Sequence, residues 1–165
     1  MFKYLWKDML DAVQYLPFGL VVGLQFAIIL YIYYAIRRKR PDGVGVRVLY
    51  ITYVAIVLCI TLFSRESGSR EGFDLELFST WGINDRNNAY VIENILLFVP
   101  YGFISAWAFK WVRRLIPSVI FGACSSILIE CVQYVTKRGY FQIDDILTNL
   151  LGSVIGYFIF RLLRR

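Results

Sequence analysis

Five apolar runs, each of a length suited to a helix across a lipid bilayer, constrain this chain more than any other feature of its sequence. The clearest run, residues 18–36, has no charged residue and measures about 28 Å as a helix, close to the hydrocarbon thickness of a bilayer. The other four cover residues 48–63, 94–109, 115–136 and 146–160. The sequence therefore predicts an all-α integral membrane bundle of about five transmembrane helices.

The composition supports lipid as the solvent of this bundle. Of the 165 residues, 58% are hydrophobic and only 18% are charged. A soluble domain of this length is usually about half apolar. We find no internal repeat or low-complexity tract, and we expect a single domain over residues 1–165.

Residues 1–14 predict a shorter, amphipathic helix before the first span. Its apolar residues share one helical face: Phe2, Leu5, Trp6, Met9, Leu10 and Val13. Charged residues lie largely on the other face, and Pro17 marks the turn into the first span. This pattern is typical of a helix that lies in the membrane interface.

The Lys and Arg residues favour one side of the membrane. With the N-terminus outside and the C-terminus inside, the cytoplasmic segments hold 11 of the 18 basic residues: Arg37, Arg38, Lys39, Arg40, Arg47, Lys110, Arg113, Arg114, Arg161, Arg164 and Arg165. The positive-inside rule selects this orientation. Because these bases stand at helix ends, where they anchor to anionic headgroups, the net charge of +6 does not indicate nucleic-acid binding.

The chain has no histidine, which excludes a His-bearing zinc site, a Ser-His-Asp triad and a Cys-His pair. Its three cysteines, Cys59, Cys124 and Cys131, lie in apolar runs without CxxC spacing, as expected of small buried side chains. Any acid–base chemistry therefore depends on carboxylates, or on the few Tyr and Lys residues at the outer face. We predict no resident cofactor and no dedicated metal site.

Polar residues recur with helical spacing near the outer ends of the last three spans. Ser126, Glu130 and Gln133 are spaced i, i+4, i+7 and share one face of the fourth span. Asn94 begins the third span, and Asp145 precedes the fifth. Because successive spans alternate in direction, these residues all lie on the same side of the membrane. We expect a polar cluster in the outer leaflet, walled by the last three spans.

Small residues identify the buried face of the fifth span. Asp145, Asn149, Gly152 and Gly156 are spaced i, i+4, i+7, i+11 and share a face. The two glycines form a GxxxG motif, which permits a neighbouring backbone to approach closely. We expect this face to pack against another helix.

Four of the polar residues also have a structural interpretation. Asn94 and Asn149 are suited to hydrogen bonds between helices. Asp144 and Asp145 are suited to cap the last helix, because acids favour a helix N-terminus. These alternatives stay open on the sequence alone.

Glu130 is harder to explain structurally. It lies roughly a turn and a half inside the apolar run, where a carboxyl group is protonated or paired unless the site contains water. Its natural partners are Lys137 and Arg138 in the following loop. We therefore expect Glu130 to have a functional role.

The polar residues belong to an ordered pattern. "ENILLFVPYGF" followed by "IECVQYVTKRGYFQIDDILTNLLGSVIGY" resembles the VanZ-like family of small bacterial membrane proteins. The resemblance covers residues 93–157, and the matching positions are Asn94, Phe98, Pro100, Gly102, Glu130, Gln133, Asp144, Asp145, Asn149, Gly152 and Gly156.

Upstream, "SREGFDLELF" resembles a degraded copy of the family's outer loop. Asp74 stands where the family usually has Asn, and Leu77 replaces a Pro. Further along, Gln142 stands where the family often has an acid. A role that depends on a third carboxylate is therefore not expected in this chain.

The resemblance implies a cell-envelope protein of the bacterial cytoplasmic membrane. The founding member of the family is associated with resistance to the glycopeptide teicoplanin, without an established biochemical activity. An outward-facing polar pocket would suit a membrane lipid headgroup or a lipid-linked cell-wall precursor.

Two hypotheses follow. In the first, the protein binds a lipid headgroup, a wall precursor or a partner protein through Asn94, Gln133, Arg138, Asp144 and Asn149. In the second, it is an intramembrane enzyme that acts on a lipid-linked envelope substrate.

For the enzyme, we predict Glu130 and Asp145 as the catalytic residues, with a divalent cation as an option because carboxylate and amide oxygens suit Mg²⁺ or Ca²⁺. Adjacent aspartates on a helix point about 100° apart, so Asp144 and Asp145 can share an ion only if the helix start is irregular. A transporter is a third reading, disfavoured because we find no inverted repeat. The sequence does not predict an oligomeric state.

Overall fold

The computed structural model describes residues 1–38, 42–63, 68 and 72–164. Predicted cytoplasmic residues Lys39, Arg40 and Arg165 lie outside this part of the chain. The described elements are α1 (Phe2–Ala12), η1 (Val13–Tyr15), α2 (Leu16–Ile36), α3 (Val44–Phe63), β1 (Phe73–Asp74), α4 (Asp85–Ala108), η2 (Lys110–Arg113), α5 (Leu115–Val135), β2 (Phe141–Gln142) and α6 (Ile143–Leu163).

Five helical segments of the described chain are long and apolar enough to cross a membrane. They are Phe2–Ile36, Val44–Phe63, Asp85–Ala108, Leu115–Val135 and Ile143–Leu163. The predicted all-α membrane bundle is confirmed. The two strands pair in parallel over two residues each, and they join the α3–α4 connection to the α5–α6 connection rather than form a layer.

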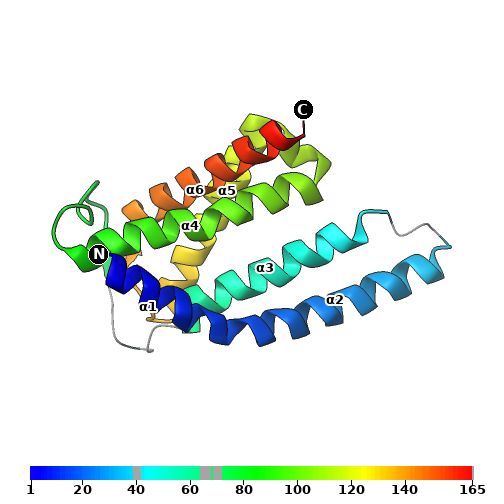
Figure 1. Cartoon of the computed structure of the whole chain (residues 1–165), viewed down its shortest axis with the longest axis horizontal. Helices are drawn as coiled ribbons and strands as arrows, with labels where there is room; N and C mark the ends of the chain where they lie inside the picture. Colours follow the sequence, from blue (N-terminus) through cyan, green and yellow to red (C-terminus); the bar gives the residue numbers. More distant parts are fainter. Residues whose placement is uncertain (39–41, 64–67, 69–71, 165) are drawn as a thin grey trace.

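The helices form two groups (Figure 1). The α2–α3 hairpin lies beside a unit of α4, α5 and α6, in which α4 packs most extensively against α6. The N- and C-termini lie at opposite ends of the molecule, as an odd number of spans requires.

The predicted N-terminal helix is present as α1 and is separated from α2 by the 3₁₀ turn η1. Pro17 lies in the first turn of α2, where its missing N–H costs nothing. One face of α1 is exposed at Phe2 and Trp6, while Leu5 is buried. Ion pairs hold α1 across the start of α4: the Met1 amine contacts Asp85 at 2.8 Å, and Asp8 contacts Arg86.

The start of α4 differs from the sequence prediction. The helix begins at Asp85 rather than at Asn94. The early start is fixed by Asn84, whose side chain accepts hydrogen bonds from the N–H groups of Arg86 and Asn87. Hydropathy does not detect these first turns because they are polar. Asn94 therefore lies inside a helix rather than at its first turn.

The contact between α4 and α6 is a backbone contact made through glycines. A Cβ atom on Gly102 would lie 2.0 Å from the Ser153 carbonyl oxygen. Cβ atoms on Gly152 and Gly156 would lie 2.3 Å from the Ile95 oxygen and 2.0 Å from the Val99 oxygen. The expectation that the GxxxG face is buried against a neighbouring helix is confirmed, and Gly102 contributes from the opposite side.

Tyrosine hydroxyls link α3 to the rest of the bundle. Tyr50 donates to the Tyr101 hydroxyl at 3.2 Å, and Tyr101 shares a 2.5 Å hydrogen bond with Ser125 of α5. Tyr53 donates to the Leu97 carbonyl at 2.6 Å, in the turn that contains Pro100. These bonds join α3, α4 and α5 within an otherwise apolar core.

The glycine contact yields a prediction about stability. Gly156→Ala should destabilise the protein by about 1–3 kcal/mol, because a methyl group has no room against the α4 backbone. The matched control is Gly45→Ala in the first turn of α3, where nothing lies within 4 Å of an added Cβ. That variant should be neutral or stabilising by up to about 1 kcal/mol. Thermal unfolding in detergent measures both, and equal effects would contradict the packing.

Candidate functional site

Asn94 and Asp145 meet at the end of the α4–α6 contact that lies nearest the start of α6. Nδ2 of Asn94 donates to Oδ1 of Asp145 at 2.8 Å. Asp145 is 6% exposed although it carries a carboxyl group. The glycine contact places these two helices close enough for the short side chains to touch.

A second pair joins α6 to α5. Nδ2 of Asn149 donates to the Ser126 hydroxyl at 3.0 Å, and both residues are buried. The amide oxygen of the same side chain, Oδ1 of Asn149, is buried and has no hydrogen-bond partner among the described residues. Buried polar atoms are usually hydrogen-bonded, so this acceptor marks a position for a water or a ligand donor.

Glu130 lies one turn beyond Ser126 on the same buried face of α5. Its carboxyl group is 1% exposed, and Oε2 accepts the backbone N–H of Gln142 at 3.0 Å. Glu130 thus holds β2, which leads directly into α6. Its predicted pairing with Lys137 or Arg138 stays a prediction.

Gln133 and Arg138 bind the C-terminal end of α3. Lys137 adopts a positive φ of 55°, and the Arg138 N–H returns to the Gln133 carbonyl, which ends α5 in a tight turn. Nε2 of Gln133 donates to the Thr61 carbonyl, and Nη1 of Arg138 donates to the Leu62 carbonyl, both at 2.9 Å. These donors satisfy carbonyls that a helix end leaves open.

The side chain of Asp144 binds the backbone of the connection between α3 and α4. Its two carboxylate oxygens accept the N–H groups of Phe78 at 2.7 Å and Thr80 at 2.9 Å. Capping of its own helix was one alternative that the sequence left open for Asp144, and the structure does not show it: both oxygens bind a distant loop that crosses the N-terminus of α6. Asp145 points to α4 instead, so the two adjacent aspartates serve different partners, as their angular separation predicts.

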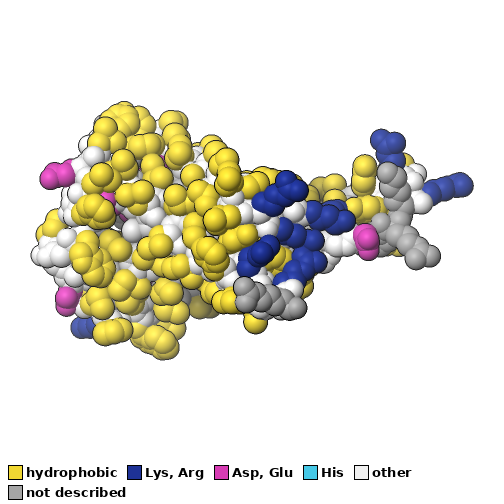
Figure 2. All heavy atoms as spheres, turned by 90° about the horizontal axis from the view of Figure 1, so that it is seen from above, with side chains coloured by type: hydrophobic (Ala, Val, Ile, Leu, Met, Phe, Trp, Pro, Cys, Tyr) yellow, Lys and Arg dark blue, Asp and Glu magenta, His cyan; other side chains and the backbone are white. Residues whose placement is uncertain are grey.

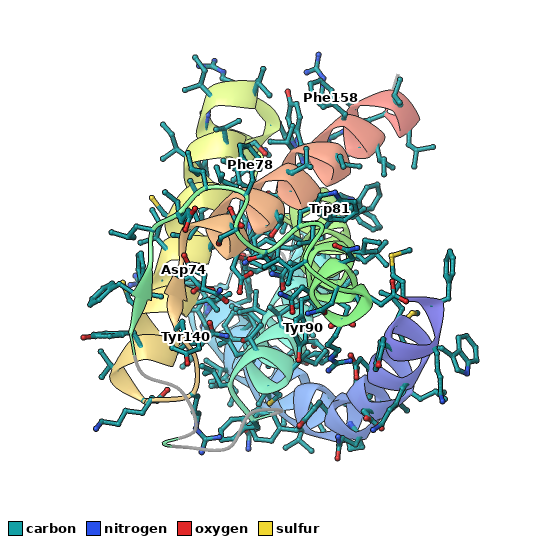
Figure 3. The ribbon with its side chains drawn as sticks, turned by 90° about the vertical axis from the view of Figure 1, so that its left-hand side faces the viewer. Asp74, Phe78, Trp81, Tyr90, Tyr140 and Phe158 are labelled. Carbon is teal, nitrogen blue, oxygen red and sulfur yellow. The ribbon has the colours of Figure 1, made fainter. Side chains whose placement is uncertain are left out.

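Two of the three departures from the pattern that the resemblance implies face each other. Asp74 and Gln142 are register partners in the β1–β2 pair, and Nε2 of Gln142 donates to Oδ2 of Asp74 at 3.3 Å. Asp74 also accepts from the Ser79 hydroxyl at 3.1 Å and appears at this end of the bundle in Figure 3. Relative to the pattern that the resemblance implies, an amide and a carboxylate have exchanged places, and in this chain the two side chains form a hydrogen bond. The first residues of the degraded block, 69–71, lie outside the described residues.

A cavity of about 710 Å³ lies beside this cluster, between α1–η1, α3 and α4. Asn94 and Thr61, the hydrogen-bond partners of Asp145 and Gln133, are both part of its wall. Polar lining residues include Lys7, Asp8, Asp11, Arg86 and Glu93, and apolar ones include Leu5, Met9, Ile60, Leu96 and Leu97. The cavity is thus amphipathic and adjoins the predicted site.

Sequence reasoning missed the wall that α1 contributes. The charged face of that helix predicts contact with water, whereas Asp8 binds Arg86 and lines the cavity. Glu93 was also missed, although it adjoins Asn94. The signal available in the sequence was the charged face of α1, which holds Lys3, Lys7, Asp8 and Asp11.

The described residues contain no group of three or more His, Cys, Asp or Glu side chains placed to hold a metal ion. The acidic residues of the cluster instead contact backbone N–H groups and an amide. Asn94 and Thr61 border the cavity, whereas Glu130, Gln133, Asp145 and Asn149 are buried behind this wall.

These features define a multi-pass α-helical membrane protein with a polar site at one end of its helices. A family model described as VanZ/LLP1 matches residues 49–164, and the chain belongs to this family.

The chain is 30% identical over 66 residues to Protein VanZ of Enterococcus faecium, a match that covers 40% of this chain and 40% of that protein. No solved structure matches the chain.

The exchanged Asp74–Gln142 pair yields a prediction. Gln142→Glu should lower thermal stability, because it brings a second carboxylate against Asp74. Adding Asp74→Asn should restore most of the loss, since the amide–carboxylate hydrogen bond forms again in the opposite sense. Detergent unfolding of the two single variants and the double variant measures the coupling. A double variant as unstable as the sum of its singles would contradict the pairing.

Proposed function

We propose that this protein binds an amphiphilic molecule of the bacterial cell envelope, either a membrane lipid or a lipid-linked wall precursor, at the polar cluster and its cavity. The observation that carries the proposal is Asn94, which lines the cavity and donates to the buried Asp145. A ligand in the cavity would therefore contact Asn94, which in turn contacts the buried Asp145.

The form of the cavity supports an amphiphile. Its volume lies within the roughly 300–1,000 Å³ of ordinary ligand sites. Charged residues supplied by α1 and the first turns of α4 suit a headgroup, whereas Ile60, Leu96 and Leu97 suit an acyl or prenyl chain.

The binding proposal predicts loss of lipid from one variant. Asn94→Leu should retain less phosphatidylglycerol or polyprenyl phosphate than wild type, because the polar contact at the cavity wall is replaced by an apolar one. Asn87→Leu, on the same helix but outside the cavity lining, is the matched control. Native mass spectrometry of detergent-purified protein gives the bound fraction of each probe. Equal retention by the two variants would contradict this site.

An intramembrane enzyme is the second candidate function, favoured by the burial of Glu130, a carboxyl group within a membrane-spanning helix. Glu130→Gln separates the two functions. The amide still accepts the Gln142 N–H but cannot exchange a proton. The enzyme proposal expects this variant to insert normally and to lose complementation of a deletion strain.

The complementation assay applies glycopeptide stress such as teicoplanin, with which the founding member of the family is associated, and other wall stress. Protein level in the membrane fraction is the control. Full complementation by Glu130→Gln would rule out both the catalytic and the ion-binding roles of this carboxyl group. Binding without catalysis would then be the remaining proposal.

We further propose that the site faces outward from the bacterial cytoplasmic membrane. Lys and Arg side chains gather toward one end of the apolar body, whereas most acidic side chains in view lie at the other end (Figure 2). The positive-inside rule places the basic end in the cytoplasm.

Orientation is measured with single cysteines in a cysteine-free background. Glu76→Cys should react with an impermeant thiol reagent on intact cells, because it lies at the acidic end, and Asp42→Cys should not. Lysed cells provide the control in which both react. The reverse labelling would move the site to the cytoplasmic side.

A further inference from the structure

The connection between α3 and α4 exposes an unusual amount of apolar surface. Its residues 75–83 include large side chains that are 52% to 76% exposed: Leu75, Leu77, Phe78, Trp81 and Ile83. Figure 3 looks onto this end of the bundle and shows Phe78 and Trp81 on the connection where it crosses the helix ends. We call residues 75–83 the apolar loop.

Polar contacts, rather than burial, fix the shape of the apolar loop. Asp144 accepts the N–H groups of Phe78 and Thr80, and Asn88 accepts the N–H of Gly82. Phe78 has a positive φ of 63°, a conformation that costs free energy in any residue with a side chain. The backbone is thus anchored to α4 and α6 while its large side chains point away from the bundle.

The anchor also fixes the height of the loop along the bundle. Asp144 lies in the first turn of α6, a helix long and apolar enough to cross the membrane. The Phe78 N–H lies 2.7 Å from the carboxylate of that residue. The loop is therefore level with the end of a membrane span, where the hydrocarbon meets the headgroups.

We propose that the apolar loop rests on the lipid surface, with its side chains in the interface between headgroups and acyl chains. The exposed fractions of its apolar side chains are similar to those of apolar side chains on the spans themselves, such as Leu20 at 64% and Leu128 at 65%. Trp is enriched at this depth because its ring is apolar while its N–H needs a polar partner. A contiguous patch of this kind is unfavourable in water.

The consequence is a role for the buried Asp144 that differs from ligand binding. Its carboxylate lies beneath the apolar loop and holds it against the end of α6. The loop covers that end of the bundle with an apolar lipid-facing surface, and the amphipathic helix α1 provides another at Phe2 and Trp6. This proposal is independent of whether the cavity binds an amphiphile.

The experiment measures the depth of Trp81 in a bilayer that contains this protein and no other. Trp6, Trp107 and Trp111, all exposed, are changed to Phe so that Trp81 is the remaining tryptophan. The protein is reconstituted into phosphatidylcholine–phosphatidylglycerol vesicles that contain lipids brominated at shallow acyl positions. We expect strong quenching of Trp81 by the brominated lipids and weak quenching by aqueous iodide.

A second measurement leaves the other tryptophans unchanged, so it still tests the proposal if their substitution disturbs folding. An environment-sensitive fluorophore is attached to Trp81→Cys or, as the matched control in the same loop, to Glu76→Cys, each in a cysteine-free background. The label at position 81 should emit further to the blue and be less accessible to iodide than the label at position 76. Water-like emission and equal iodide quenching at both positions would overturn the proposal and indicate that the loop docks a soluble partner instead.

Discussion

The backbone contact between α4 and α6 is the constraint on which the site depends. Gly102, Gly152 and Gly156 remove the side chains that would otherwise separate the two helices. Lipid supplies no hydrophobic driving force between helices, so close packing and hydrogen bonds have to hold them together. The same close approach lets Asn94 donate a 2.8 Å hydrogen bond to Asp145. If the two helices lay further apart, only longer side chains could make this bond.

The polar residues at this end divide by what they contact. Asp144, Gln133 and Arg138 bind backbone groups of the neighbouring chain segments and so organise the loop and the end of α3. Asn94 and Asn149 differ, because Asn94 borders the cavity and Asn149 retains a buried acceptor without a partner among the described residues. A single polar cluster thus combines structural contacts with one residue, Asn94, that borders the cavity.

Hydropathy and helical spacing were enough to predict much of the fold. Apolar runs located the spans, and the spacing of Ser126, Glu130 and Gln133 predicted a face that the structure buries to 2% exposure or less. The predicted start of α4 was wrong, because the first turns of this helix are polar and depend on the Asn84 cap. Local sequence carries no hydropathy signal for such a start.

Partners distant in sequence were the part that could not be predicted. Asp144 binds Phe78 and Thr80, and Asp74 binds Gln142, because β1 pairs with β2 across more than sixty intervening residues. Only the folded topology brings these residues together. The cavity likewise depends on where α1 lies, which its amphipathic pattern does not determine.

The most direct measurement is a double-mutant cycle of Asn94→Ala and Asp145→Ala, with unfolding free energies determined in wild type and in Gly156→Ala. In wild type we predict a coupling of roughly 0.5–3 kcal/mol, the range for a side-chain hydrogen bond. In the Gly156→Ala background the coupling should fall toward zero, because the helices are forced apart. No coupling in wild type, or a coupling unchanged by Gly156→Ala, would contradict the claim that the glycine contact builds the site.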